Sequence, residues 1–255
     1  MEFCGGCFMK KLFQKNEIWF AIVFIIIYVV GSSVADVISA SIGITKLITL
    51  AFDIVLSLCL FLFIKNNHLN RYFGLCKPQY PAARFLYYFP LIVLASVNIW
   101  FGVQMNMPVA DTICYVGSML FVGFLEELIF RGLLFNAMRK DNVETAIIVT
   151  SILFGIGHIV NLFNGRGMEL VANICQVVYA AAIGFLFVTI FYKGGSLWPC
   201  IITHSIVNAM STFANDTVAA RYQIPIAMVM VVIAMAYALI LWRTIPATQK
   251  FACDK

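Results

Sequence analysis

The stretch that decides the fold is DTICYVGSMLFVGFLEELIFRGLLFNAM, Asp111–Met138. It is long and apolar enough to cross a bilayer, because a membrane-spanning helix needs about 20 predominantly apolar residues. Near its middle lie Glu126, Glu127 and Arg131, three formal charges within six residues. Ionisable side chains at membrane depth are costly, and they usually mark a functional site. We therefore expect the rest of the chain to form a scaffold around these three residues.

The composition of the whole chain is that of a polytopic membrane protein. Of its 255 residues, 62% are hydrophobic and only 11% are charged, more apolar surface than a soluble domain of this size needs. The apolar runs predict an all-α membrane helix bundle of about eight transmembrane helices. We expect residues 1–255 to form a single integral membrane domain. The expected spans are residues 18–34, 48–64, 85–103, 111–138, 145–162, 170–192, 197–213 and 224–242.

The basic residues are distributed as topology requires. Thirteen of the 17 Lys and Arg residues fall in segments on one side of this arrangement, three (Lys46, Arg166 and Arg221) fall on the other, and Arg131 alone is intramembrane. Because cytoplasmic loops carry the excess of basic residues, we expect both termini in the cytoplasm. The net charge of +5 then reflects topology, and nucleic acid is not an expected partner.

The cysteines do not predict a disulfide framework, since half of the eight lie in apolar spans, where cysteine is usually a small core residue. Cys4 and Cys7 form a CxxC on the tail expected in the cytoplasm, where disulfides are rare. Spare thiols or an acylation site are the simplest interpretations of this pair.

Helix geometry separates the three central charges. Glu127 and Arg131 are four residues apart, so they lie on one face within reach of an ion pair. Glu126 is rotated from Glu127 by about 100°. We therefore expect a structural Glu127–Arg131 pair and a chemically available Glu126. A static buried network of all three is the alternative.

Two further spans carry polar groups. His158 lies in SILFGIGHIVN, and His204 lies in LWPCIITHSIVN with Asn208 four residues after it. A single buried histidine is usually a satisfied core residue. Rare intramembrane polar groups on three helices, however, each need a partner away from lipid, and a common polar cavity supplies one for all of them. Asn161 and Gln176 are candidates to line the same cavity.

A carboxylate, two imidazoles and an amide suit the activation of water. A desolvated carboxylate is a better general base, an imidazole can hold the same water or protonate a leaving amine, and an amide can donate to an oxyanion. The same carboxylate and imidazoles, Glu126, His158 and His204, could instead bind Zn²⁺ with an open position for water. The residues alone leave both chemistries open.

Three motifs carry a resemblance to a known family. EELIFRGLLF, LFGIGH and HSIVN resemble the EExxxR, FxxxH and HxxxN motifs of the CAAX-protease and bacteriocin-processing (Abi-type) intramembrane endopeptidases. Order and context match, with each motif in its own span, over about residues 116–211. The resemblance implies a membrane hydrolase in which Glu126 and His158 activate water and His204 and Asn208 stabilise the oxyanion.

The resemblance also assigns supporting residues. Glu127 and Arg131 support the site, and Phe154 shapes the cavity by packing. The family has been described both as metalloproteases and as metal-free glutamate-type proteases. We favour the metal-free chemistry without a cofactor, because every motif residue then has a role without HExxH-type ligand spacing, and we keep Zn²⁺ as the alternative.

The expected substrate is a membrane-associated peptide or protein tail. The short chain resembles the compact prokaryotic members of the family, which favours a plasma-membrane location and processing of a peptide precursor or leader over a prenylated CAAX substrate. A non-catalytic membrane immunity or regulatory partner with the same fold is the main alternative. A proton-coupled transporter is a third, although the repeated halves and broken helices of transporters are not evident in the sequence.

Overall fold

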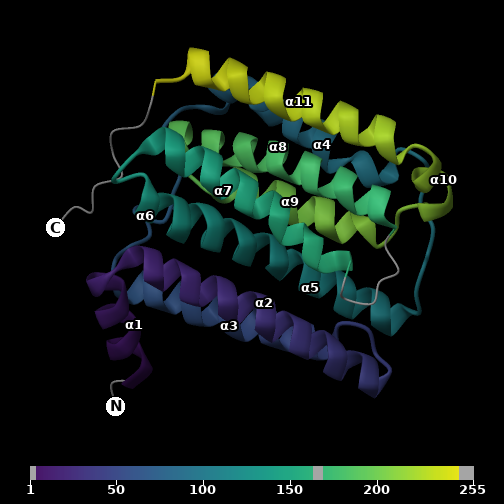
Figure 1. Cartoon of the computed structure of the whole chain (residues 1–255), viewed down its shortest axis with the longest axis horizontal. Helices are drawn as coiled ribbons and strands as arrows, with labels where there is room; N and C mark the ends of the chain where they lie inside the picture. The colour runs from purple at the N-terminus through teal and green to yellow at the C-terminus, as the bar shows by residue number, and fades with distance from the viewer. Residues whose placement is uncertain (1–3, 163–168, 247–255) are drawn as a thin grey trace.

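The protein is an all-α polytopic membrane helix bundle, as predicted. The computed structural model describes residues 4–162 and 169–246, within which no β-strand occurs and seven helices are long and apolar enough to cross a membrane. The elements (Figure 1) are α1 (Cys4–Lys15), α2 (Glu17–Ile42), α3 (Leu47–Asn66), η1 (Ala82–Tyr88), α4 (Phe89–Ala95), η2 (Val97–Ile99), α5 (Val109–Glu127), η3 (Leu128–Phe135), α6 (Asn136–Met138), α7 (Val143–Gly157), η4 (His158–Leu162), α8 (Leu170–Gly194), α9 (Trp198–Ser211), α10 (Asp216–Arg221) and α11 (Gln223–Thr244).

One end of the bundle, which we call the proximal end, holds α1 and the loops 67–81, 139–142 and 195–197. Glu17 joins several of these segments, because its carboxylate accepts from Lys140 Nζ at 2.6 Å and from the hydroxyl of Tyr72 at 2.6 Å. The amide of Leu197 donates to the carbonyl of Gly74 at 2.8 Å. The proximal loops are thus tied to one another by polar contacts.

The opposite end, which we call the distal end, holds the loops 43–46, 100–108 and 212–222. The amide of Thr45 donates to Asp111 at 2.8 Å, which joins the α2–α3 turn to the start of α5. The amide of Gln104 donates to the carbonyl of Phe213 at 2.9 Å. Each long helix therefore runs from one of these two ends to the other.

The first span is longer than predicted. Polar residues after Gly31 placed its end near residue 34, but α2 continues from its Asn16 N-cap to a left-handed Gly43. Asp36 is accommodated in the last turns because Lys46 Nζ donates to both of its carboxylate oxygens at 2.7 Å. Lys46, which the α2–α3 turn brings back to α2, thus neutralises the Asp36 carboxylate, and the helix can continue past it.

Two predicted spans differ from regular transmembrane helices. The third is divided into η1, α4 and η2, with left-handed backbone at Leu86, Tyr87 and Tyr88; Pro90 lies in the first turn of α4, where proline is tolerated. The seventh corresponds to α9, which has only 14 residues, fewer than the about 20 needed for a full crossing.

The charged stretch lies in the central helix, which runs from α5 through η3 to α6 and packs on α2, α3, α7 and α9. Immediately after Glu127 the helix becomes π-helical over η3, a wider winding that is frequent at functional sites. Every residue of η3 is buried. The central helix therefore presents its charges to other helices.

Candidate active site

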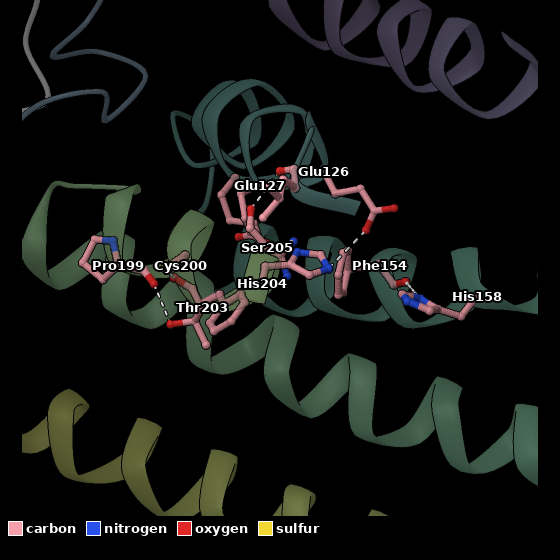
Figure 2. Close-up of polar contacts among 12 residues, drawn as sticks. Glu126, Glu127, Phe154, His158, Pro199, Cys200, Thr203, His204 and Ser205 are labelled. Atoms are coloured by element: carbon pink, nitrogen blue, oxygen red, sulfur yellow. Dashed lines mark hydrogen bonds and ion pairs between the residues drawn. The ribbon is translucent and has the colours of Figure 1, made fainter. Parts of the chain in front are cut away.

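A buried carboxylate connects the two outer motifs. Glu127 Oε1 accepts from Arg131 Nη1 at 3.1 Å and from His204 Nδ1 at 2.8 Å, and Figure 2 shows the Glu127 and His204 side chains facing each other. Glu127 and Arg131 are almost fully buried. Because an ionised carboxylate only accepts, His204 Nδ1 carries a proton and the other ring nitrogen is free for a second partner.

The carboxylate nearest that nitrogen is Glu126, which His204 Nε2 attracts when both ring nitrogens carry protons. Its Oε2 lies 3.7 Å from His204 Nε2, and its Oε1 accepts from the hydroxyl of Tyr28 at 2.7 Å. The Glu126 side chain is 17% exposed whereas that of Glu127 is 0% exposed. The two neighbouring carboxylates thus occupy different environments, and Glu126 is the one that a substrate could reach.

His158 begins η4, directly after α7. Its Nδ1 lies 3.0 Å from the carbonyl oxygen of Phe154, and since a carbonyl only accepts, this nitrogen must donate. In the neutral ring, Nε2 is then an unprotonated acceptor. The backbone of its own helix therefore sets the His158 tautomer needed to take a proton.

The ring of Phe154 lies between the two histidines (Figure 2). Its centroid is 5.2 Å from that of His158 and 5.7 Å from that of His204, with edge-to-face geometry in both pairs. The Arg131 guanidinium lies over the same ring at 4.0 Å, a favourable cation–π position. Phe154 therefore holds the cation and separates the imidazoles.

A cavity of about 330 Å³ adjoins these residues. Glu126, Phe154, His158 and Asn208 line it, which brings residues from all three motifs to one space. Its volume is at the lower end of ligand pockets, about 300–1,000 Å³, which suits a short stretch of extended peptide.

His204 is placed differently from the other candidates. It is buried, 8% exposed, and is not among the residues that line the cavity. Asn208, one turn further along α9, lines the wall instead. The resemblance assigns oxyanion stabilisation to His204 and Asn208 together. In the structure, Asn208 lines the cavity, whereas His204 faces the two glutamates.

A close approach of two helices positions His204. A Cβ added to Gly123 of α5 would overlap the backbone of Ser205 in α9, so only glycine permits this separation. The Ser205 hydroxyl donates to the carbonyl of Leu120 at 2.8 Å. Together these contacts set the register in which His204 reaches Glu127.

The alternative zinc set consists of Glu126, His158 and His204. Carboxylate and imidazole are suitable zinc donors, but across residues 4–162 and 169–246 no three His, Cys, Asp or Glu side chains lie close enough together to hold a metal ion. Glu126 and His204 approach each other, whereas His158 lies on the far side of the Phe154 ring. As placed, Glu126, His158 and His204 do not fit a zinc site.

Residues 108–210 match the family described as type II CAAX prenyl endopeptidase Rce1-like. Over these residues, which are less than half of the chain, the sequence is similar to the Rce1-like family. The resemblance found in the motifs is thereby confirmed, and protease is the class of activity that the match supports. No curated protein and no solved structure matches the chain.

The Rce1-like segment builds only part of the cavity. It carries Glu126, His158 and Asn208, whereas α2 and the α2–α3 turn lie outside it and contribute Tyr28 and the Asp36–Lys46 ion pair to the wall. The family match therefore covers the charged centre but not the opposite wall.

Two residues that were predicted to line the cavity do so, and three of its other lining residues were not predicted. Asn161 and Gln176 line the cavity, and the Asn161 amide donates to Gln176 at 3.0 Å. Tyr28 and the Asp36–Lys46 pair were not singled out. The available signal was weak: a tyrosine in an apolar span, and an aspartate near its end.

Proposed function

We propose that the chain is an intramembrane endopeptidase in which Glu126 activates the attacking water. The observation that carries the proposal is the placement of the Glu126 carboxylate at the cavity wall, between the Tyr28 hydroxyl and His204 Nε2. A carboxylate oriented from two sides and open on a third is suited to take a proton from a bound water.

The reaction follows from the positions of the remaining groups. Water oxygen bonds to the scissile carbonyl carbon while Glu126 takes the water proton, and the carbonyl electrons move to the oxygen. The Asn208 amide donates to that oxyanion from the same wall. Collapse of the adduct breaks the carbon–nitrogen bond, and the proton passes from Glu126, directly or through His158 Nε2, to the leaving amine.

Glu127, Arg131 and His204 act indirectly in this scheme. Arg131 offsets the charge of Glu127, and Glu127 fixes the tautomer and orientation of His204. A hydrogen-bonded carboxylate commonly orients a functional imidazole in this way. When both of its ring nitrogens carry protons, His204 also pairs with Glu126 at 3.7 Å, which replaces the oxyanion role that the resemblance implies.

The proposal is tested with purified protein in lipid vesicles and two probes, a farnesylated CAAX peptide and a pool of unprenylated precursor peptides. Wild type is compared with Glu126→Gln and with Glu144→Gln, a control at an exposed glutamate of α7. We expect cleavage of unprenylated peptides by wild type and the control, no cleavage by Glu126→Gln, and no effect of a strong chelator. Undiminished cleavage by a folded Glu126→Gln protein would contradict the proposal.

Two other outcomes would favour a different function or mechanism. Activity that a chelator removes and Zn²⁺ restores would assign Glu126, His158 and His204 to a metal. Cleavage of neither probe by any folded form would favour the non-catalytic membrane partner.

A further inference from the structure

The two ends of the bundle differ sharply in charge. In the described parts of the chain, Lys46 and Arg221 are the only basic residues at the distal end. Because basic residues accumulate on the cytoplasmic side of membrane proteins, the proximal end faces the cytoplasm. The basic residues at or beside the proximal end are Lys10, Lys11, Lys15, Lys65, Arg71, Lys77, Arg84, Arg139, Lys140, Lys193 and Arg243.

The proximal positive charge is not offset by nearby carboxylates. Among the described residues at that end, Glu17, Asp141 and Glu144 are the acidic side chains, and Glu17 is already paired with Lys140. At the distal end Asp36 pairs with Lys46, and Asp111 and Glu169 add negative charge. The proximal end therefore remains the more positive of the two when acidic residues are also counted.

The cavity is asymmetric in the same direction. Tyr28, Glu126 and Phe130 line it at or beyond the middle of their helices, and none of its lining residues comes from the proximal loops. Most of the others lie toward the distal ends of their helices, for example Asp36 near the end of α2 and Ser211 at the end of α9. The space thus extends from mid-bundle to the distal end.

Polar groups mark the distal part of the cavity. Asn161 and Gln176, paired with each other, lie where α7 ends and α8 begins, and both are partly exposed. The Asp36–Lys46 pair lies on the opposite wall, near the α2–α3 turn. A rim of this kind can hydrogen-bond the backbone of a polar peptide, which lipid-facing surface cannot.

We infer that the catalytic cavity opens to the membrane face opposite the cytoplasm, and that its substrate is an extended peptide segment presented from that face. This inference rests on the proposed function for the chemistry. A tail anchored at the cytoplasmic leaflet would meet the proximal end, whereas Glu126 is approached from the distal end. The substrate class is therefore an exported peptide, or the outer segment of a membrane protein.

Orientation is tested by labelling, which does not depend on activity. In a background with the native cysteines replaced by alanine or serine, single cysteines are introduced as Ser211→Cys at the cavity, Arg221→Cys at the exposed distal surface and Asp141→Cys at the exposed proximal surface. Intact cells of a bacterial host are treated with a membrane-impermeant maleimide. We expect labelling of the first two positions, and of Asp141→Cys only after permeabilisation.

Labelling of Asp141→Cys in intact cells, with Ser211→Cys and Arg221→Cys labelled only after permeabilisation, would overturn the inference. Labelling of Arg221→Cys would also overturn it if Ser211→Cys stayed unlabelled even after permeabilisation. If the cysteine-free background does not accumulate, C-terminal fusions to a fluorescent protein and to a periplasmic phosphatase keep the native cysteines and report the orientation. Phosphatase activity without fluorescence would then refute the inference. Failure of every peptide to be cleaved would contradict the protease proposal and leave the labelling result standing.

Discussion

The hydroxyl of Tyr28 lies 2.7 Å from Glu126 Oε1, joining two residues that are 98 positions apart in the chain. Tyr28 belongs to α2, outside the segment that matches the Rce1-like family. The proposed catalytic carboxylate is thus oriented partly by a helix that the family match does not include.

Removal of this hydroxyl should impair catalysis without unfolding the protein. A hydrogen bond to a charged group contributes about 1.5–3 kcal/mol, so Tyr28→Phe should lower kcat/KM by about ten- to a hundredfold. Tyr115→Phe is the matched control, because Tyr115 also lines the cavity. Equal activity of the two variants in the peptide assay would show that Tyr28 does not position Glu126.

The buried Glu127–Arg131 pair should be sensitive to the loss of either member. Removing one partner of a buried ion pair costs about 3–5 kcal/mol, because the other charge is left uncompensated. Arg131→Met should therefore lower the thermal unfolding temperature in detergent, and Glu127→Gln/Arg131→Met should recover part of the loss. Lys140→Met, at the half-exposed Lys140–Glu17 pair, should cost only about 0–1 kcal/mol. A double variant that is less stable than Arg131→Met and less stable than Glu127→Gln would contradict this prediction.

Phe154 should matter for both packing and electrostatics. Phe154→Ala removes a buried ring and should destabilise the fold by about 3–5 kcal/mol. Phe154→Leu keeps most of the side-chain volume but loses the aromatic ring beneath Arg131. It should therefore be more stable than Phe154→Ala and still impaired in cleavage. Thermal unfolding and kcat/KM, measured together, separate the two effects. Wild-type kcat/KM in Phe154→Leu would mean that the ring acts by volume alone.

The contact of α5 with α9 depends on Gly123. Gly123→Ala should push the helices apart, because the new methyl group would meet the Ser205 backbone, and overpacking typically costs about 1–3 kcal/mol. Gly157→Ala is the control, since no heavy atom lies within 4 Å of its added Cβ. The measurement is thermal unfolding of both variants in detergent. An unchanged unfolding temperature in Gly123→Ala would contradict the close approach.

Local spacing accounts for what the sequence could predict. Glu127 and Arg131 form the expected ion pair because a helix alone brings residues four apart together. The apolar runs predicted the all-α bundle, since a bilayer requires internally hydrogen-bonded spans. The roles of Glu126, His158, His204 and Asn208 in catalysis stay predictions that the experiments above address.

What could not be predicted depends on how the helices meet. The Tyr28–Glu126 contact and the position of His204 behind the cavity arise from packing between distant segments. The extension of α2 beyond Gly31 required the Asp36–Lys46 pair, which forms only after the chain has turned back. The division of the third span and the π-helical winding of η3 have no clear signal in an apolar pattern.

Two separable stretches of chain supply most of the cavity lining. The Rce1-like segment holds the groups proposed to break the peptide bond, and the α2–α3 hairpin covers them with Asp36, Lys46 and Tyr28. Chemistry and selectivity can therefore diverge independently. A chimaera that exchanges residues 17–66 for the corresponding hairpin of a relative should accept a different set of peptides, provided that it keeps a tyrosine at position 28.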